Sequence, residues 1–412
     1  MQKQLKQLLL VLAAIVIGWP IDLEAVESGQ AAGATIDVPS GPTEKQPVWS
    51  DPEGRHSRFL VNGGAFHVLV DDLDGDGRPD LLFTSHGGNM LRVFRQTAAR
   101  RFEATDEQDI AGFHPNDTIA LPGAPKRYLI NAEGKSLLRV TAAQPDGRLT
   151  LISDYSLPHP LGTTPFAWPG WGPLSLAVAP YTGSSVTLLR DFNPEKGEAK
   201  AAIEIAAEAD PQPARLADLD GDGVPELVFP TFRTNKVWAI EPRGSEQVPH
   251  VRELAAFKMG WPRHVVPFDL NQDGAMDLLV PMSVRPRIVG LLNDGKGQFT
   301  RRAPIPYPGS TGAHTLAVGQ DAGGRYLLAG GSRALVLYRE LKERPGDFET
   351  IMLARPHFTW PNRVELVDVD GDRWLDAAVA DQGEAQSEVI YGPLWDIFGK
   401  LSVNPTAAVK PD

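Results

Sequence analysis

Short apolar runs separated by polar turns recur along this chain of 412 residues. Representative runs read HVLV, LLFTS, LVFPTF, LLVPM and AAVAD, and most are bounded by Gly, Pro, Asp or Asn residues. Runs of this length with many β-branched and aromatic residues are typical of β-strands. The pattern therefore predicts an all-β chain of many short strands from about residue 60 onward.

Four nine-residue loops that share one arrangement of acidic residues lie between these runs. The first reads DLDGDGRPD and begins at Asp72, and the others begin at Asp218, Asp269 and Asp368. Mutual repulsion would splay such a loop unless a cation neutralised it. Calcium takes roughly six to eight oxygen ligands in a flexible cage, and glycine lets the chain bend tightly around the ion. We therefore predict about four calcium ions, one in each loop.

The predicted ligands occupy equivalent positions in the four loops. Positions one, three, five and nine supply side-chain oxygens, and position seven supplies a backbone carbonyl oxygen. The predicted side-chain ligands are Asp72, Asp74, Asp76 and Asp80, then Asp218, Asp220, Asp222 and Glu226, then Asp269, Asn271, Asp273 and Asp277, and finally Asp368, Asp370, Asp372 and Asp376. The predicted carbonyl ligands are Arg78, Val224, Ala275 and Trp374.

An EF-hand would share the acidic opening of these loops, but it needs a bidentate Glu at position twelve and flanking helices. Position twelve is Phe or Val in all four loops and the flanking runs are β-rich, which excludes an EF-hand. In the last loop Arg373 replaces a glycine and adds a cation beside the carboxylates. We therefore expect this loop to bind calcium most weakly.

The spacing of the loops indicates a repeat. Their first aspartates are 146, 51 and 99 residues apart, close to three, one and two units of about 49 residues. The period predicts three further units near residues 121, 170 and 319, whose loops have lost their carboxylates. Seven units of four short strands describe a β-propeller. We predict a seven-bladed β-propeller of four-stranded antiparallel blades, with calcium-binding loops in four of them.

With its four Asp loops and the glycine-rich turn NDGKGQF at residues 293–299, the chain resembles the FG-GAP/VCBS repeat proteins. The propellers of that family resemble the amino-terminal head of integrin α-subunits, and the resemblance here extends over roughly residues 60 to 397. It implies that each acidic loop joins the first two strands of a blade and binds calcium. The literal FG and GAP signatures are missing, and the resemblance says little about the ligand.

The amino-terminal residues indicate export. A lysine-bearing start precedes an apolar run from Leu8 to Trp19, which is too short to span a bilayer comfortably and suits a signal peptide. The alternative is an uncleaved anchor. We expect a secreted or periplasmic protein with no stable membrane span after processing. The predicted segments are a signal peptide at 1–34 cleaved after Ala25 or Ala34, a flexible leader at 35–58, the propeller at 59–400 and a carboxy-terminal tail at 401–412.

The net charge of −12 does not require a basic partner, because the loops hold 15 of the 52 Asp and Glu residues. Four calcium ions would neutralise eight of these charges, and no basic patch stands out, so we expect no nucleic acid partner. The chain has no cysteine, which excludes a disulfide framework. We expect a monomer.

A second set of residues shares one position in separate repeats. His67, His264 and Arg363 each precede the first loop aspartate by five residues, and His314 occupies the matching point of the sixth unit. This is the start of the strand nearest the propeller axis, so we expect these side chains to cluster at one mouth of the central channel, near Arg215 and Arg263. They would favour an anionic group, gripped by Arg363, with the histidines tuning affinity between pH 5 and 8. The alternative is that they cap strand ends and bind water.

The chain has no nucleophile elbow, phosphate loop or zinc motif that would identify an enzyme class. Three functions are compatible with the sequence. The first, which we favour, is a binding or adhesion module for a glycan or protein ligand, such as a carboxylated glycan or an acidic peptide loop. The second is an enzyme of the lyase or dehydratase type acting on an acidic polysaccharide, with His and Arg abstracting a proton and neutralising a uronate. The third is a structural or assembly scaffold. We expect Trp168, Trp261 and Trp360 to pack between blades rather than to bind sugars.

Overall fold

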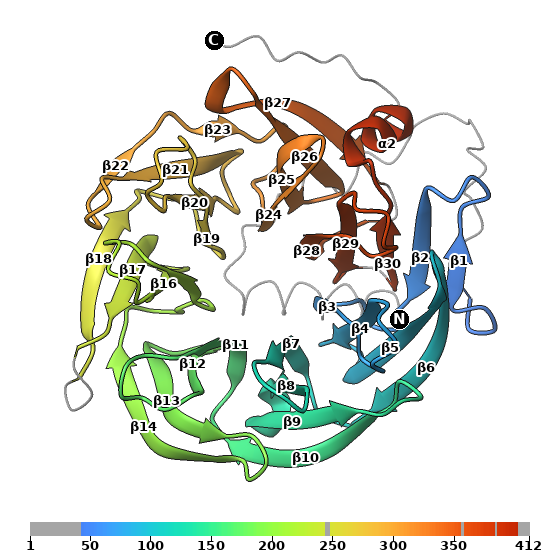
Figure 1. The fold of residues 1–412 in the computed structure, drawn as a ribbon, viewed down its shortest axis with the longest axis horizontal. Coiled ribbons are helices and arrows are strands. Elements are labelled where there is room, and N and C mark those ends of the chain that lie inside the picture. Colours follow the sequence, from blue (N-terminus) through green and yellow to red (C-terminus); the bar gives the residue numbers. More distant parts are fainter. Residues whose placement is uncertain (1–42, 244–247, 356–357, 384, 403–412) are drawn as a thin grey trace, which may run out of the picture. The chain divides into compact units, whose positions relative to one another are not determined.

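The computed structural model of the chain describes residues 43–243, 248–355, 358–383 and 385–402. In this part of the chain the strands form seven sheets arranged around a central axis (Figure 1). The described residues are therefore a seven-bladed β-propeller, as the repeat spacing predicted. The predicted signal peptide at 1–34 and nearly all of the tail lie outside the described residues.

Blades 1 to 3 are antiparallel meanders in which each strand pairs with the next along the chain. The 3-10 turn η2 (Glu133–Lys135) joins two strands of blade 2. The strands are β3 (His67–Asp71), β4 (Asp80–Ser85), β5 (Met90–Ala98) and β6 (Arg101–Asp109) in blade 1; β7 (Pro115–Leu121), β8 (Arg127–Ala132), β9 (Leu137–Ala143) and β10 (Leu149–Ser156) in blade 2; and β11 (Pro160–Phe166), β12 (Ser175–Pro180), β13 (Ser185–Asn193) and β14 (Glu198–Ala206) in blade 3.

Blades 4 to 6 repeat this order, except that β23 adds to blade 5 by pairing with β21. The strands are β15 (Arg215–Ala217), β16 (Glu226–Thr231), β17 (Lys236–Glu241) and β18 (His250–Ala256) in blade 4; β19 (Val266–Pro267), β20 (Leu278–Pro281), β21 (Arg287–Asn293), β22 (Phe299–Arg301) and β23 (Ile305–Pro306) in blade 5; and β24 (Thr315–Asp321), β25 (Gly324–Gly331), β26 (Ala334–Leu341) and β27 (Arg344–Ala354) in blade 6.

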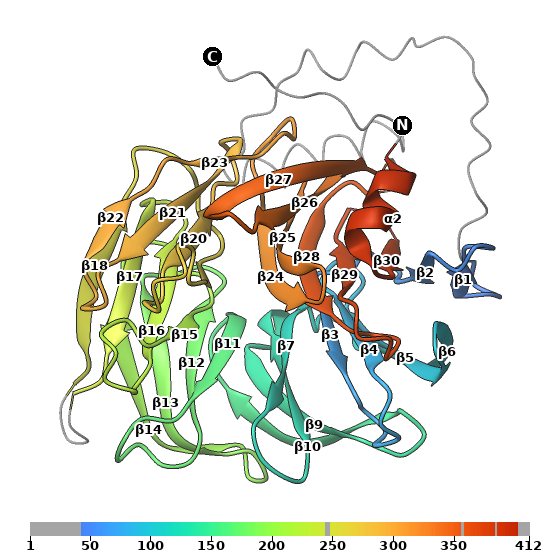
Figure 2. The same cartoon turned by 45° about the horizontal axis from the view of Figure 1, so that its top comes forward.

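Blade 7 closes the ring with strands from both ends of the described chain, and its sheet runs in the order β1-β2-β30-β29-β28. Figure 2 shows β2 and β1 on the outer side of β30. Ser57 of β2 lies opposite Val389 of β30 in an antiparallel pair. The strands are β1 (Val48–Ser50), β2 (His56–Leu60), β28 (Pro361–Val367), β29 (Asp376–Asp381) and β30 (Gln386–Ile390).

The prediction of a flexible leader at residues 35–58 is wrong for its described part, because β1 and most of β2 lie in it. Phe59 of β2 packs against Phe83 and Phe94 of blade 1, with ring centroids 5.9 and 5.0 Å apart. Burying such a ring contributes about 1.5–3 kcal/mol to stability. β2, which carries Phe59, and β1 are the two outer strands of blade 7. The propeller therefore begins before residue 59.

The turn from the first to the second strand of each blade lies where the repeat period placed it. In blades 1, 4, 5 and 7 this turn is an acidic loop, as the resemblance implied. In the three remaining blades it spans residues 122–126, 167–174 and 322–323, close to the predicted positions. The glycine-rich turn from Asn293 to Phe299 joins β21 to β22, also as predicted.

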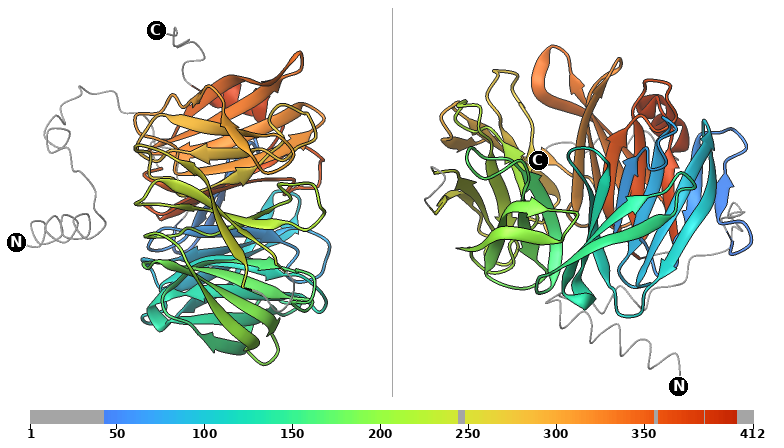
Figure 3. Two further views of the ribbon diagram at one scale, coloured as in Figure 1. Left: turned by 90° about the vertical axis from the view of Figure 1, so that its left-hand side faces the viewer. Right: turned by 60° about the horizontal axis from the view of Figure 1, so that its bottom comes forward.

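Burial follows from the packing of blades against one another, which Figure 3 shows from two sides. Both faces of a second strand meet a neighbouring blade, so all six residues of β4 are buried. Outer strands meet solvent on one face, and β14 alternates exposed with less exposed residues. The sequence did not predict helix α2 (Leu394–Leu401), whose Leu394 and Phe398 are buried in a core shared with blades 6 and 7. Among the described residues, no helix has the length and apolar character that crossing a membrane requires.

Candidate functional site

The acidic loops share a backbone that wraps around the first carboxylate. In blade 1 the Oδ1 atom of Asp72 accepts a hydrogen bond from the Gly75 N–H at 2.8 Å, and Oδ2 accepts one from the Gly77 N–H at 3.0 Å. The same pair of bonds recurs at Asp218 and Asp368, and a close variant recurs at Asp269. The short polar side chain thus fixes the turn in each loop.

The ninth carboxylate of each loop is buried at the start of the second strand. Asp80 accepts hydrogen bonds from the N–H groups of Leu73 at 3.0 Å and Gln96 at 2.8 Å, and Asp277 and Asp376 have equivalent partners. Burial, with the neighbouring loop aspartates adding to it, raises the pKa of Asp80 to about 6 and that of Asp376 to about 7. A cation among these oxygens would favour the ionised form.

Three of the loops gather carboxylates closely enough to hold one ion. One oxygen from each of three residues lies within 4.8 Å of the other two in blades 1, 4 and 7. The groups are Asp72, Asp74 and Asp80; Asp218, Asp220 and Asp222; and Asp368, Asp370 and Asp376. An all-oxygen donor set in a glycine-bearing loop fits calcium better than a softer metal. Blade 5 offers the Asn271 amide at the position of the second aspartate.

At position seven, the backbone N–H of each predicted carbonyl ligand donates to the fifth-position aspartate. The distances are 2.9 Å for Arg78, 2.7 Å for Val224 and 2.9 Å for both Ala275 and Trp374. The carbonyl role of these four residues remains a prediction. The Arg78 side chain pairs with Asp76 of its own loop.

The last loop differs from the expectation in one respect. Arg373 adopts the left-handed conformation of the glycine it replaces, with φ 74°, and its N–H bonds Asp368 at 2.9 Å. The cation that meets the carboxylates is Arg100 from the β5–β6 turn of blade 1, 2.5 Å from Asp370 and 3.2 Å from Asp372. Arg100 and Arg373 together give the reason to expect weak binding in this loop.

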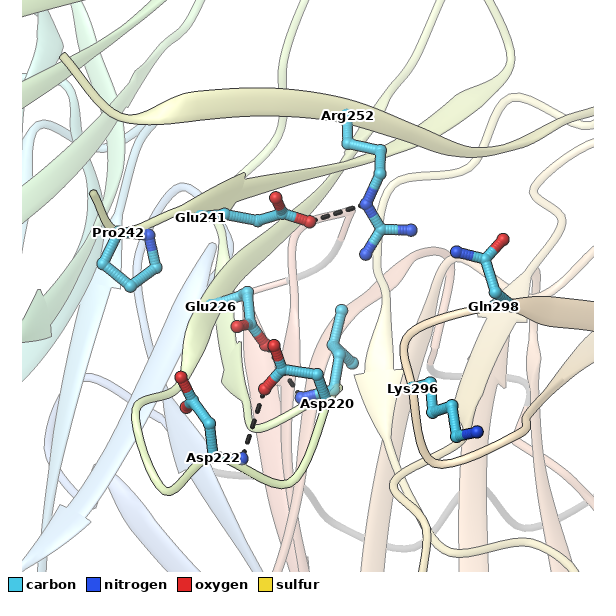
Figure 4. A pocket seen from close by; sticks show the side chains of 9 residues that line it. Asp220, Asp222, Glu226, Glu241, Pro242, Arg252, Lys296 and Gln298 are labelled. Carbon is cyan, nitrogen blue, oxygen red and sulfur yellow. Dashed lines mark hydrogen bonds and ion pairs between the residues drawn. The ribbon is translucent and has the colours of Figure 1, made fainter.

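The blade 4 loop opens into a pocket of about 250 Å³ (Figure 4). Figure 4 places Asp220, Asp222 and Glu226 on one side of this pocket and Lys296 and Gln298, from the β21–β22 turn of blade 5, on the other. Burial and the loop aspartates raise the pKa of Glu226 to about 7. Arg252 lies above the loop, bonded to Glu241 at 2.6 Å and to the carbonyl of Gly297 at 2.7 Å.

A second cavity, of about 60 Å³, lies on the propeller axis, because its lining residues come from all seven blades. The four residues predicted from their shared repeat position all line it, and Arg263 lines it too. The polar and charged residues that line it are His67, Asp117, Gln212, Arg263, His264, His314, Asn362 and Arg363. The predicted convergence is therefore observed, whereas the binding of a ligand there remains a prediction.

Asp117 is the main residue of this cavity that the sequence did not reveal. It is buried, and its Oδ1 lies 2.8 Å from Nε2 of His67. Burial alone would raise its pKa, but His67 and the charges of Arg363 and Arg215 lower it to about 2. Counting five residues back from position 121, where the period predicts the second unit, gives Asn116, so the signal was one residue out of phase with Asp117.

Two of the histidines cannot tune affinity between pH 5 and 8. Burial and the nearby positive charge of Arg263 lower the pKa of His314 to about 3. Burial and the charges of Arg363, Arg215 and Arg263 hold the pKa of His264 well below its usual range. Both rings are neutral at physiological pH because protonation would add charge to a buried, positively charged place. That part of the sequence interpretation is wrong.

Arg363 also differs from its predicted role. Its Nε donates to Glu365 at 2.7 Å, so its charge already has a partner. Of the tryptophans, Trp168 donates from Nε1 to the carbonyl of Pro225 in blade 4 at 2.8 Å, and Trp360 stacks on His314 with centroids 3.8 Å apart. Trp261 lies 5.4 Å from Phe232 between ring centroids. The first two contacts join neighbouring blades, as expected for packing residues.

Comparisons with known proteins agree with the fold. Residues 218–280, which include the acidic loops of blades 4 and 5, match the FG-GAP-like repeat family. A crystal structure of BBS1N in complex with ARL6DN is similar with a TM-score of 0.55 at 12% identity, over 80% of this chain and 92% of that chain. A virginiamycin B lyase from Staphylococcus aureus, solved with quinupristin, is similar with a TM-score of 0.53 at 13% identity, over 81% of this chain and 98% of that one. These similarities show the fold alone. A comparison with curated proteins gives no match.

Proposed function

The chain is an FG-GAP repeat β-propeller, and we propose that it is an exported, calcium-binding module that takes a glycan or protein ligand at its axial cavity. One observation carries the proposal. All seven blades supply lining residues to a single cavity. Four of these residues occupy the same position in their repeats. Repeats that have diverged elsewhere keep chemistry-bearing groups at this point of the ring.

The polar groups of the cavity favour a binding role over a purely structural one. Both ring nitrogens of His314 and Nδ1 of His67 are buried without a hydrogen bond in the described chain. Each buried polar group left without a partner costs about 1–3 kcal/mol. A scaffold gains nothing from this cost, whereas a ligand that bonds these groups offsets it.

Calcium would be held by the four acidic loops, with Asp80, Glu226, Asp277 and Asp376 as the buried ligands. The bound ion would supply the positive charge that these buried carboxylates lack. Because each loop joins the first two strands of a blade, binding to the folded state alone would stabilise the ring by mass action.

Export is supported by the signal-peptide pattern at residues 1–34, which fits a secreted or periplasmic protein. The many surface ion pairs and the acidic net charge support a partner other than nucleic acid, and we expect the propeller to act as a monomer. Nothing in this proposal requires a stable membrane span.

A lyase acting on an acidic polysaccharide is the second candidate, and His67 favours it. Its Nε2 lies 2.8 Å from the ionised Asp117, and a carboxylate that orients an imidazole is a common arrangement for a general base. Arg263, on the same cavity, could neutralise the uronate whose proton is removed.

An array of acidic and neutral glycans and acidic peptides tests the binding function, with the full chain applied in calcium and in chelator. We expect binding in calcium that is lost in Arg263→Ala and retained in Arg148→Ala, because Arg263 lines the cavity whereas Arg148 is an exposed arginine in the β9–β10 turn of blade 2. An array without hits, or hits that both variants retain, would overturn the axial binding function. Release of an unsaturated sugar from a polysaccharide hit would replace the module with the lyase.

A further inference from the structure

The charges around the axial cavity do not balance. The ionised groups that act on one another there are three arginines and two carboxylates, and the two histidines discussed above are neutral. The five charged residues are Arg215, Arg263, Arg363, Asp117 and Glu365. The arginines exceed the carboxylates by one, so with His67 held in its pair with Asp117 one further negative charge would balance the arginines.

Arg263 carries this unbalanced charge. Glu365 pairs with Arg363 at 2.7 Å, whereas Arg263 forms no ion pair with any described residue and lies with its guanidinium 4.6 Å from the ring centroid of Phe232. Burial lowers the pKa of Arg263, but an arginine stays protonated at neutral pH. A half-buried guanidinium without a carboxylate partner favours an anion beside it.

His314 presents an unpartnered donor to the same cavity. The side chain is only 4% exposed, and neither ring nitrogen forms a hydrogen bond within the described chain. Stacking on Trp360, with centroids 3.8 Å apart and planes 25° apart, fixes the plane of the ring. A neutral imidazole has one N–H, which can donate to an anion without adding charge.

Two side-chain amides also line the cavity. The side-chain oxygens of Gln212 and Asn362 accept no hydrogen bond within the described residues, although their NH₂ groups donate to the carbonyls of Asp210 at 3.3 Å and Phe66 at 2.7 Å. Such oxygens suit hydroxyl donors, which a sugar carries and an acidic peptide side chain does not. The cavity of about 60 Å³ exceeds several times the ~10–15 Å³ that one water needs, so it has room for one carboxylate.

Resting on the axial binding function, we propose that this cavity recognises the carboxylate of a uronic-acid sugar, with Arg263 as the cationic anchor and His314 as a neutral hydrogen-bond donor. The amide oxygens of Gln212 and Asn362 accept hydrogen bonds from hydroxyls of the same sugar. A monocarboxylate matches the single unbalanced charge, whereas a dianion would leave an excess negative charge beside Asp117.

Calorimetric titration of the full chain in calcium with glucuronate and galacturonate tests the proposal, with glucose and galactose as uncharged counterparts and a short Asp-containing peptide as a third arm. We expect at least one uronate to bind and both neutral sugars and the peptide to bind at least tenfold more weakly. Arg263→Gln should weaken uronate binding about tenfold or more, the loss expected for a charged hydrogen bond. Arg148→Gln removes an exposed arginine and should change nothing.

His314→Phe keeps the stacked ring and removes both nitrogens, so it tests the site even if Arg263→Gln fails to fold. We expect it to weaken uronate binding about two- to tenfold, as for one neutral hydrogen bond. Uronate and neutral sugar binding equally, stronger binding of the peptide, or uronate affinity unchanged in both variants would each overturn the proposal. Array binding that uronate does not displace would overturn the uronate site while leaving the binding module intact.

Discussion

Asn293 donates a hydrogen bond from Nδ2 to the carbonyl oxygen of Leu219 at 2.8 Å and thereby ties blade 5 to the acidic loop of blade 4. Its backbone N–H bonds Asp277 of its own blade at 2.7 Å, and its Nδ2 also bonds the carbonyl of Met276 at 3.1 Å. One side chain thus connects two acidic loops in consecutive blades. Through this connection a metal bound in one blade would stabilise the next.

Within the described ring, the same amide bridge recurs only in a blade whose preceding blade also carries an acidic loop. Gln96 of blade 1 donates from Nε2 to the carbonyl of Val369 in the loop of blade 7, also at 2.8 Å. Blades 4 and 7 follow blades without an acidic loop, and at the corresponding position, sixteen residues after the ninth carboxylate, they have Pro242 and Gly392. Neither has a side-chain amide. The bridge is therefore part of the loop architecture.

Replacing Asn293 by Ala should destabilise the ring by about 2–3 kcal/mol, because it leaves buried carbonyls without donors. It should also weaken calcium binding in blade 4, whose loop it supports. Urea denaturation in calcium and in chelator measures both effects. Asn62→Ala, which removes an exposed amide bonded to Glu44, is the control and should change stability by less than about 0.5 kcal/mol. Equal effects of the two variants would contradict the bridge.

Elemental analysis of the dialysed full chain should give close to four calcium ions, with none contributed by blades 2, 3 and 6. Chelation should lower the melting temperature in a single cooperative transition, since each loop joins two strands of its blade. A stoichiometry near zero, zinc in place of calcium, or a melting curve that does not respond to chelator would exclude the proposed role of the loops.

Arg100 should reduce calcium affinity in blade 7, because it pairs with Asp370 and Asp372 and an ion would have to displace or share these partners. We expect Arg100→Gln to bind calcium in this loop more tightly, by about two- to tenfold, in calorimetric titrations of chelator-treated protein. Arg101→Gln, one residue later on the exposed strand β6, is the control. Unchanged or weaker affinity in Arg100→Gln would assign the weakness to Arg373 alone.

The sequence predicted the propeller well, because the acidic loop repeats in it. The carboxylate spacing recurs with a period, and this period located even the blades that have lost the acidic residues, as at residues 122–126. It also located His67, His264, His314 and Arg363, because equal phase in a closed ring means equal height along the axis.

What the sequence could not predict depends on contacts between distant segments. β2 looks like part of a linker until Phe59 meets Phe83 and Phe94, and helix α2 gains its place only by packing on blades 6 and 7. The unpaired charge of Arg263 follows from which arginine Glu365 reaches, a property of side-chain placement. These are tertiary effects that local patterns do not encode.

Glu226 should make the metal-free ring less stable at high pH. Its pKa is raised to about 7 in the folded state by burial and by Asp220 and Asp222, so the penalty is absent below its ordinary pKa of 4.5, grows as pH rises from 4.5 to about 7 and is complete above that. In chelator at pH 8, Glu226→Gln should therefore be more stable than the wild type, by roughly 1–2 kcal/mol. In calcium the order should reverse, because the variant loses a ligand.

Denaturation at pH 5 and pH 8, with and without calcium, measures this crossover. Glu103→Gln on the exposed strand β6 is the matched control and should show no crossover. The open pocket beside Glu226 and the proline at position 242 distinguish this loop, since Pro242 has no N–H with which to bond the second oxygen of the carboxylate. A variant that is less stable than the wild type under all four conditions would assign Glu226 a structural role without metal.

His314 should make the ring sensitive to acid. Its pKa is lowered to about 3 in the folded state, chiefly by burial and then by Arg263, whereas the unfolded chain takes up the proton near pH 6.5. The neutral ring thus stabilises the fold fully above pH 6.5, and this contribution is lost progressively as pH falls toward 3, by up to about 1.4 kcal/mol per pH unit.

His314→Phe keeps the stacking on Trp360 but cannot titrate, so its denaturation free energy should fall less steeply between pH 6 and pH 4 than that of the wild type. His159→Asn, which removes an exposed histidine from a left-handed position that asparagine tolerates, should leave the slope unchanged. Identical slopes for His314→Phe and the wild type would mean that the imidazole is protonated within the folded ring, and the neutral donor assigned to the axial cavity would then be wrong.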